Sequence, residues 1–408
     1  MDDTASKTES SSKRRPRGAA ILGGRWGARR GLGLVSVIVP AFNAARTVER
    51  TVTSALNQTY SNLEILVVDD GSKDETAALV HRMATGDQRI KLLQKANGGL
   101  VSARNHGITH AQGEFIAPLD ADDLWHPDKL RKQIAAVQDE IGLVYCWSRT
   151  IDTQDRVLFD LAPCALRGNV YAILIIKNFI HSGAPLVRRS CIDGVGGYDA
   201  TLAAKGAACC EDLKFNLDVA ERYDFEVVPE FLSAYRLHPG TMSRNLDAML
   251  QSHKFVVADA RARHPELPDR LFRWASAHQN LEFGLVNIGG GRILTGLQLL
   301  SEALLADPLD TLRFGALRIH ARLARLVAVA TPSTTLAGQS SNTIAGCNFI
   351  ETDPTVRCGG TRAPWTADRL AYITGLYVNR SRSPLDNQHD AAGGPHVRAL
   401  PPFGQTAG

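Results

Sequence analysis

The sequence has 408 residues, and its apolar content of 44% is ordinary for a soluble protein with a substantial core. The net charge is only +4, and residues 1–34 alone carry eight Lys and Arg against three Asp and Glu, so the remaining chain is about neutral. We therefore expect no nucleic-acid partner. The length predicts one large domain with an appendage, or two domains.

Cysteine usage and hydropathy bear on the cellular location. The seven cysteines are odd in number and form no C-x-x-C pair, which argues against a disulfide framework or a zinc site. No apolar run approaches the roughly 18 residues of a membrane-spanning helix, and the N-terminus lacks the layout of a signal peptide. We expect a cytoplasmic protein, with peripheral contact at the inner face of a membrane as a further option.

The first half of the chain predicts strands that alternate with helices. Residues 1–33 are rich in Ser, Gly and Arg and predict a disordered basic tail. Short apolar runs then predict strands at 35–39, 63–68, 90–93 and 114–118, followed by helices at 46–57, 74–84, 100–111 and from Pro127 onwards. Apolar strands that alternate with helices predict an α/β fold with a mostly parallel sheet flanked by helices.

The second half has a less regular pattern. From about residue 142 short strand-like runs are mixed with loops, with a helix predicted at 211–221 and a strand at 231–238. We place the main domain at 34–245 and a helical C-terminal region at 246–330. Residues 331–408, rich in Gly, Ser, Thr, Pro and Asn, are expected to be largely disordered.

Polar clusters follow three of the predicted strands, at residues 40–43, 69–72 and 120–123. In parallel sheets ligands bind beyond the carboxyl ends of the strands, so these clusters predict a shared site. Two carboxylates at i and i+2, such as Asp120 and Asp122, can face one divalent cation that also binds a diphosphate. The alternative is an acidic surface turn that caps the following helix.

Four segments in this order resemble the family 2 glycosyltransferases, which have the GT-A fold. They are residues 35–43, 67–72, 97–105 and 119–123. The resemblance covers about half of the chain, ending near residue 245. It implies inverting transfer of a sugar from a nucleoside-diphosphate sugar, with uracil favoured as the base and thymine and guanine left open. The implied acceptor is a hydroxyl of a glycan or a lipid-linked molecule, in cell-surface polysaccharide or glycoconjugate biosynthesis.

The resemblance implies roles for residues that hold the nucleotide. Pro40, Phe42 and Asp70 match positions around the nucleobase, where Asp70 accepts a hydrogen bond from a base N–H and Asp69 is structural. Asn97 and Arg104 match positions near the nucleotide and its phosphates, and the planar donors of Arg suit phosphate. The alternatives are a turn carboxylate for Asp70 and a solvated helix residue for Arg104.

The resemblance also implies the metal site and the base. Asp120 and Asp122 match the two ends of the DXD motif. Asp122 is the firmer ligand of Mn²⁺ or Mg²⁺, and Asp120 contacts the ribose, the metal or both. Glu211 and Asp212 match the acidic pair, with Asp212 as the general base that an inverting displacement needs. The alternative for Asp212 is a cap of the helix that follows.

The segment from 235 to 243 resembles the closing part of the same fold. It implies His238 as a further metal ligand or diphosphate contact, and Arg236 and Ser243 as contacts of phosphate oxygens. A lone histidine is more often structural, and only the place of His238 in this segment favours a role at the site.

Two other functional classes are compatible with this fold pattern. A sugar nucleotidyltransferase is disfavoured because the first strand is not followed by a Gly- and Arg-rich phosphate loop. A non-catalytic sugar-binding protein is disfavoured because all the required carboxylates are present. Finally, residues 309–328 predict a helix with an apolar face and an adjacent arginine face, which either binds a membrane surface or docks on the domain.

Overall fold

The computed structural model of the protein describes residues 33–161, 163–238, 240–241, 245–309, 311–313, 315 and 345–357. The basic tail expected at residues 1–33 therefore lies outside the described residues except for Gly33. Most of the segment expected to be disordered at 331–408, and most of the amphipathic segment at 309–328, also lie outside them.

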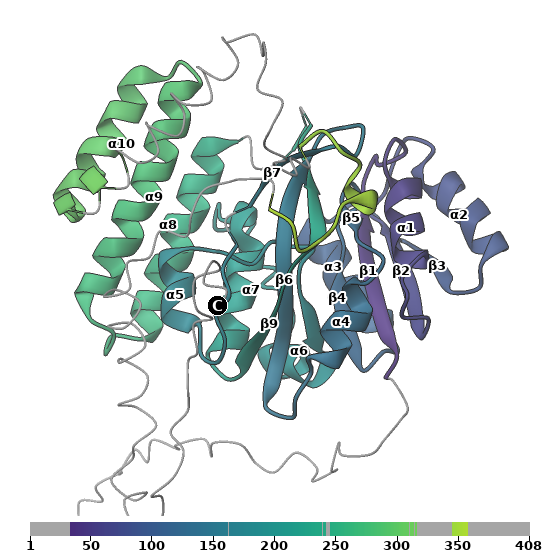
Figure 1. Ribbon diagram of the computed structural model, residues 1–408. Coiled ribbons are helices and arrows are strands. Elements are labelled where there is room, and N and C mark those ends of the chain that lie inside the picture. Colours follow the sequence, from purple (N-terminus) through teal and green to yellow (C-terminus); the bar gives the residue numbers. More distant parts are fainter. Residues whose placement is uncertain are drawn as a thin grey trace, which may run out of the picture. The chain divides into compact units, whose positions relative to one another are not determined.

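A nine-stranded sheet runs through the described part of the chain (Figure 1). The strand order is β3-β2-β1-β4-β8-β6-β9-β5, and β7 pairs with β6. The strands are β1 Val35–Ala41, β2 Leu63–Asp69, β3 Ile90–Gln94, β4 Phe115–Pro118, β5 Leu124–Trp125, β6 Ile141–Ile151, β7 Val157–Asp160, β8 Leu186–Arg188 and β9 Asp224–Arg236.

The first four strands pair as the alternating sequence pattern predicts. Strand β1 is parallel to both β2 and β4, and β2 is parallel to β3. The later strands are different, because β8 is antiparallel to β4 and β6, and β5 is antiparallel to β9. The α/β architecture is thus confirmed, while the sheet as a whole is mixed, since the chain after residue 140 no longer alternates strand with helix.

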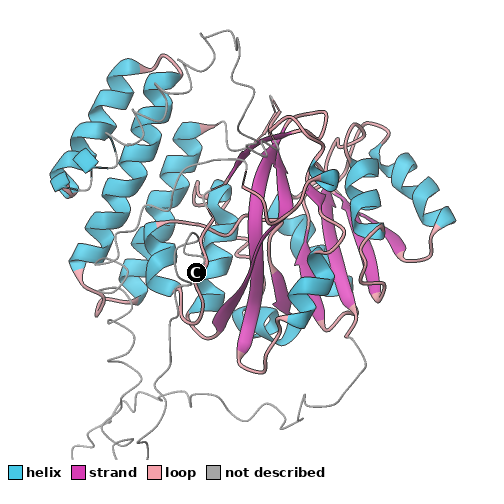
Figure 2. Cartoon of the chain, in the orientation of Figure 1, coloured by secondary structure: helices cyan, strands magenta, loops and turns pink. Residues whose placement is uncertain are grey.

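Helices cover both faces of this sheet (Figure 2). They are α1 Val48–Leu56, α2 Thr76–Gly86, α3 Leu100–His110, α4 Lys129–Ala135, α5 Tyr171–Ile176, α6 Arg189–Val195, α7 Glu211–Ala220, α8 Leu246–Arg263, α9 Asp269–Gly289 and α10 Ile293–Ala306. The last three bear out the helical character predicted after residue 246. No helix among the described residues is both long enough and apolar enough to cross a bilayer.

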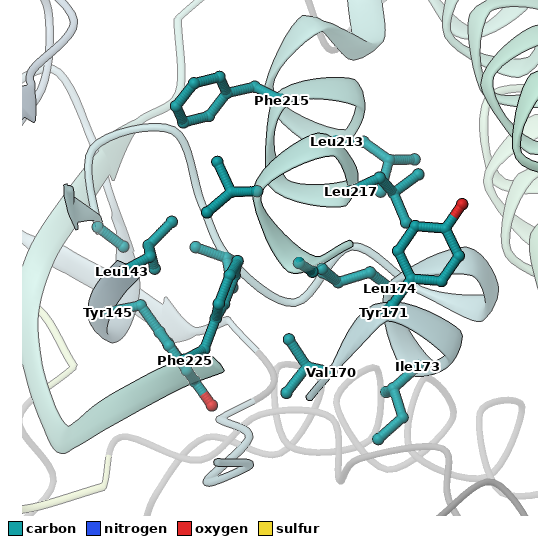
Figure 3. Close-up of a cluster of buried hydrophobic side chains, with 14 of the residues drawn as sticks. Leu143, Tyr145, Val170, Tyr171, Ile173, Leu174, Leu213, Phe215, Leu217 and Phe225 are labelled. Atoms are coloured by element: carbon teal, nitrogen blue, oxygen red, sulfur yellow. The ribbon is translucent and has the colours of Figure 1, made fainter. Parts of the chain in front are cut away.

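Alternation along β1 divides the core into two layers. Ile38 belongs to a large cluster with residues of α3, α5 and α7, whereas Val37 and Val39 belong to a second cluster with α1, α2 and α4. Successive strand residues point to opposite faces, so one fully apolar strand serves both layers. Figure 3 shows part of the first layer, where side chains of α5 and α7 meet residues of β6 and β9.

Residues 345–357 are a described segment within the stretch expected to be disordered. They contain a short 3-10 helix at Phe349–Glu351, and Asn348 forms an isolated β-bridge with Arg156. Phe349 is completely buried. The expectation of disorder was therefore wrong for these residues, because the polar composition of the whole stretch did not indicate that Phe349 is buried.

Two helical glycines offer a matched test of the packing of α3. A Cβ at Gly107 would lie 2.6 Å from the Ile38 side chain and 3.0 Å from that of Val68, whereas a Cβ at Gly86 meets nothing within 4 Å. We predict that Gly107→Ala lowers the free energy of unfolding by about 1–3 kcal/mol, since overpacking forces β1 and α3 apart.

Gly86→Ala is the control, and it should leave stability unchanged or raise it by about 0.5–1 kcal/mol through helix propensity and reduced chain entropy. Urea denaturation of both variants measures the difference. Equal stabilities for the two variants would contradict the close packing of α3 on β1.

Candidate active site

An acidic turn at residues 120–123 lies between β4 and β5. The backbone N–H of Asp123 donates to the Asp120 carbonyl at 3.0 Å, which closes the turn. The buried Thr51 hydroxyl of α1 lies 2.9 Å from the carbonyl oxygens of both Ala121 and Asp123. Helix α1 is therefore hydrogen-bonded to the turn, and the predicted polar cluster lies just beyond the end of β4.

The Arg104 guanidinium joins this turn to the acidic pair at the start of α7. It contacts Asp120 Oδ1 at 2.6 Å and Glu211 Oε1 at 2.9 Å, and its side chain is only 1% exposed. Burial alone would raise the pKa of Asp120, but the charge of Arg104 brings it below its ordinary value. The interpretation of Arg104 as a solvated helix residue was wrong, because two carboxylates distant in sequence enclose it.

Asp122 lies on the more open side of the turn, beside His238. His238 Nε2 is 2.9 Å from Asp122 Oδ2, and His238 Nδ1 accepts a hydrogen bond from the N–H of Gly240 at 3.1 Å. In neutral His238 the proton therefore lies on Nε2 and is donated to Asp122. Burial and the neighbouring Asp120 raise the pKa of Asp122.

The predicted metal ligands are only partly brought together. Among the described residues, no three or more His, Cys, Asp or Glu side chains are arranged to hold a metal ion. Asp122 and His238 form a pair, but both oxygens of Asp120 have other partners, Arg104 and Ser182. Mg²⁺ commonly uses one or two carboxylates together with substrate phosphates. The donors therefore fit a cation held by Asp122 and completed by phosphate oxygens.

Asp212 combines burial with an orienting hydrogen bond. Its Oδ2 accepts from Asn178 Nδ2 at 3.0 Å, and its Oδ1 accepts from the N–H of Leu213 at 2.7 Å. Burial and the adjacent Glu211 raise the pKa of Asp212 to about 7. A carboxylate with such a pKa can accept a proton near neutral pH. The helix-cap alternative is borne out in part, since Asp212 accepts from a first-turn N–H of α7, although Cys210 occupies the N-cap position itself.

The loop between α5 and β8 contributes two residues that the sequence did not reveal. Asn178 contacts Asp212, and the Ser182 hydroxyl donates to Asp120 Oδ2 at 2.7 Å. One loop thus contacts both acidic clusters. It is itself held by Trp125, whose ring N–H donates to the Gly183 carbonyl at 2.8 Å. The irregular pattern after residue 142 carried no signal for these contacts, which depend on loop conformation.

A second polar region follows β1 and β2. Asp70 is buried, and its carboxylate accepts from Lys95 Nζ at 2.6 Å and from the N–H of Gly99 at 2.7 Å. Asn97 Nδ2 donates to the Asp70 carbonyl at 2.9 Å. Gly99 has a φ of +84°, a conformation that favours glycine. The 97–99 loop is therefore built around Asp70.

The other residues expected around the nucleobase lie at the end of the neighbouring strand β1, where the N–H of Asp70 donates to the Ala41 carbonyl. Pro40 is buried in β1, where it is paired with Val68 of β2, and Phe42 directly after this strand is 50% exposed. Asp69 Oδ1 accepts from the N–H of Ser72 at 3.0 Å, in agreement with its expected structural role. An exposed ring beside a buried carboxylate loop leaves an aromatic surface that can stack on a ligand ring.

Arg236, expected to contact phosphate oxygens, is instead 1% exposed beneath the acidic turn. Its Nε donates to the Asp122 carbonyl at 2.6 Å, and its Nη1 forms an ion pair with Asp155 at 2.5 Å. Its backbone N–H donates to Asp123 Oδ1 at 2.9 Å. These contacts make Arg236 a support of the turn. Ser243, expected to contact phosphate as well, lies outside the described residues.

Comparison with known proteins now identifies the domain that carries this site. Residues 36–190 match the family model described as glycosyl transferase family 2. The chain carries a glycosyl transferase family 2 domain.

Relatives of this family 2 domain match it over limited lengths. An uncharacterized glycosyltransferase of Rickettsia typhi is 34% identical over 176 residues, which cover 41% of this chain and 54% of the relative. A chondroitin synthase of Pasteurella multocida is 41% identical over 95 residues, covering 23% of this chain and 10% of the relative. The chain thus spans about half, or much less, of the length of these relatives.

A solved structure similar to the chain is a mannosyltransferase of Pyrobaculum calidifontis in complex with GDP-Man and Mn²⁺. It is 22% identical, with a TM-score of 0.49, and the match covers 72% of this chain and 80% of that protein.

Removing the buried positive charge of Arg104 should lower the stability of the family 2 domain. Arg104→Met leaves Asp120 and Glu211 buried without their charged partner, so we predict a loss of about 3–5 kcal/mol in the free energy of unfolding. Arg131→Met is the control, because Arg131 is 54% exposed and forms an ion pair with Asp128. Such exposed pairs contribute about 0–1 kcal/mol. Urea denaturation at pH 7 distinguishes the two, and similar losses would contradict a bridging role for Arg104.

The raised pKa of Asp212 predicts a stability change that depends on pH. The folded protein holds this proton up to about pH 7, whereas the unfolded chain loses it near the ordinary value of Asp. Ionised Asp212 therefore destabilises the fold at pH 8, and this penalty disappears as the pH falls through 7 towards 4.

We predict that Asp212→Asn is more stable than wild type at pH 8, by on the order of 1–3 kcal/mol, and that the gain shrinks at pH 5. Thermal unfolding at both pH values measures it. A gain that is the same at pH 5 and pH 8 would show that Asp212 has an ordinary pKa.

Proposed function

We propose that this protein is an inverting glycosyltransferase that moves a sugar from a nucleoside-diphosphate sugar to an acceptor hydroxyl. The observation that carries the proposal is the linkage of two acidic clusters through Arg104 and the 178–182 loop. One cluster suits a cation and a diphosphate, and the other presents a carboxylate with a pKa near 7. Membership of the domain in family 2 supports the same assignment.

Asp212 is proposed as the general base. In a single displacement at the anomeric carbon, the acceptor oxygen forms the new bond as its proton passes to Asp212, and the bond to the diphosphate breaks on the opposite face. Asn178 keeps Oδ2 of Asp212 in place, which limits rotation of the carboxylate. Burial and, after it, the neighbouring Glu211 raise the pKa of Asp212, and Glu211 forms an ion pair with Arg104.

Asp122 is proposed to hold a divalent cation, Mn²⁺ or Mg²⁺. His238 would become a second ligand only once Nε2, which now donates to Asp122, has lost its proton. When bound, the cation would neutralise negative charge on the departing diphosphate. Asp120 is the less direct participant, because its oxygens already bind Arg104 and Ser182, and a contact with ribose or metal would use the remaining lone pairs of these oxygens. Arg236 supports the turn from below rather than contacting phosphate.

The nucleobase is proposed to lie against Phe42 and the loop around Asp70. The half-exposed Phe42 ring supplies a stacking surface, and buried Pro40 sets the end of β1. A base N–H would compete with Lys95 for Asp70 Oδ1, because the loop amides occupy the other positions of this carboxylate. Asn97 stabilises the same loop through its hydrogen bond to the Asp70 carbonyl. Uridine diphosphate is the favoured carrier of the donor sugar.

The acceptor is proposed to be a glycan or a lipid-linked molecule in polysaccharide or glycoconjugate biosynthesis, at the cytoplasmic face of a membrane. A non-catalytic sugar-binding protein is the second candidate. It would need the carboxylates of the turn for binding but would not need Asp212 to be ionisable near pH 7, so the two candidates differ in the effect of Asp212.

The experiment first finds the donor by thermal shift with a panel of nucleotide sugars and Mn²⁺, then measures sugar transfer or hydrolysis from the labelled donor. We predict that Asp212→Asn lowers kcat by about 10²–10⁴-fold while nucleotide binding changes little. Asp122→Asn should lower activity even more than the loss of any single contact to Asp212. The variant lacks the proposed ligand of the cation that would balance the negative charge of the diphosphate. Wild-type kcat/KM should rise with pH through about 7 as Asp212 ionises.

Asp193→Asn is the matched control, because Asp193 is an exposed carboxylate of α6 that belongs to neither acidic cluster. It should transfer sugar at the wild-type rate. Full turnover in Asp212→Asn or in Asp122→Asn would overturn the catalytic proposal, whereas nucleotide binding without any transfer or hydrolysis would favour the sugar-binding alternative.

A further inference from the structure

Residues 345–357, here called the C-terminal strap, are hydrogen-bonded to the turn between β6 and β7 (Figure 1, yellow-green). The N–H of Gly346 donates to the Val157 carbonyl at 2.8 Å, and the N–H of Val157 donates to Cys347 at 2.9 Å. The N–H of Phe349 donates to the Asp155 carbonyl at 2.9 Å. Three backbone bonds within five residues make the strap a continuation of this hairpin.

The strap also supplies a backbone partner inside the main sheet. The pairing of β6 with β9 is irregular, and its register shifts on both sides of the pair formed by Trp147 and Phe231. The N–H of Phe231 donates instead to the carbonyl of Pro354 in the strap, at 2.8 Å. Buried backbone N–H groups need a partner. The strap therefore supplies a hydrogen-bond partner to β9, the strand next to the β5 end of the sheet.

A buried cation of β6 depends on the strap as well. Arg149 is fully buried; its Nε contacts Asp160 Oδ1 at 3.1 Å and its Nη1 donates to the Thr352 hydroxyl at 3.0 Å. Its Nη2 donates to the Val356 carbonyl. Truncating the partners of a buried guanidinium is strongly unfavourable, so these contacts hold the strap firmly.

Two connections lead from the strap to the acidic turn. The first begins at Asp155, which has a φ of +67° and whose carbonyl accepts a hydrogen bond from the N–H of Phe349. The Asp155 carboxylate forms the ion pair with Arg236, and Arg236 donates a hydrogen bond to the carbonyl of Asp122. In addition, the Phe349 side chain belongs to a buried cluster with Leu124, the residue directly after the turn.

We propose that the C-terminal strap is a positioning element for the acidic turn, acting through Asp155 and Arg236 on one side and through Leu124 on the other. The importance of this role for sugar transfer rests on the proposed function, because it is Asp122 of this turn that is assigned to the cation and the diphosphate. Phe349 is completely buried and contacts the turn through Leu124 and Asp155. It keeps the turn in the one arrangement in which Asp122 faces its partners.

Neighbouring residues of the strap allow a matched test in the full-length protein. Phe349 is completely buried, whereas Ile350 is 40% exposed. Hydrogen exchange is compared in wild type, Phe349→Ser and Ile350→Ser. We expect Phe349→Ser to speed exchange by about tenfold or more in residues 120–126 and 149–157, because the open state becomes more populated. Residues 271–288 of α9 and the whole Ile350→Ser protein should exchange as wild type does.

Phe349→Leu is the second variant, since it keeps an apolar side chain and protects against loss of the fold. It should give a smaller acceleration confined to the same two segments. Faster exchange in the strap with unchanged exchange at 120–126 would overturn the proposal, as would equal effects of Phe349→Ser and Ile350→Ser.

Function is read separately from exchange. In the transfer assay, Phe349→Ser should raise the concentration of Mn²⁺ needed for half-maximal activity several-fold, while excess Mn²⁺ restores most of kcat. An unchanged Mn²⁺ requirement in the presence of fast exchange at 120–126 would contradict the link to Asp122. If wild type transfers no sugar at all, the proposed function fails, but the exchange experiment still decides the role of the strap.

Discussion

The buried guanidinium of Arg104 is the interaction on which the arrangement of the site depends. It brings a carboxylate from the end of β4 and one from the start of α7 into contact with the same cation. Without that positive charge, the two acidic segments would repel one another in a poorly solvated region. Arg104 is itself placed by α3, which approaches β1 and β2 closely enough for Gly107 to be needed at the contact. Backbone packing thus determines where the charges meet.

Neighbouring carboxylates of the site differ in pKa because their surroundings differ. The charge of Arg104 keeps the pKa of Asp120 below its ordinary value. Burial and Asp120 raise the pKa of Asp122, and burial and Glu211 raise the pKa of Asp212 to about 7. Such a separation assigns distinct tasks to chemically identical groups. An ionised Asp120 serves structure, whereas a carboxylate that titrates near neutrality can take up a proton.

The part of this organisation that follows local rules could be predicted from the sequence. The four parallel strands and their helices follow from the periodicity of apolar residues, and the acidic turn follows from its place directly after a strand. All were found where expected. Asn178 and Ser182 could not be predicted, because their roles depend on a loop whose path is set by contacts such as that of Trp125. The contacts of Arg236 with the acidic turn could not be predicted either, since a sequence motif does not reveal which side of a turn a side chain occupies. Phe349 was missed because a single apolar anchor does not alter the composition of a polar stretch.

The contact between Arg149 and Thr352 spans 203 residues of sequence, which has a consequence for how the protein matures during synthesis. Domains fold as the chain emerges from the ribosome, N-terminal parts first. The parallel strands can therefore assemble long before the C-terminal strap, which supplies a hydrogen-bond partner to Phe231 of β9, has been translated. A chain that stops before residue 345 would carry a folded sheet whose acidic turn lacks these contacts, so the site would be complete only after residues 345–357 have been translated.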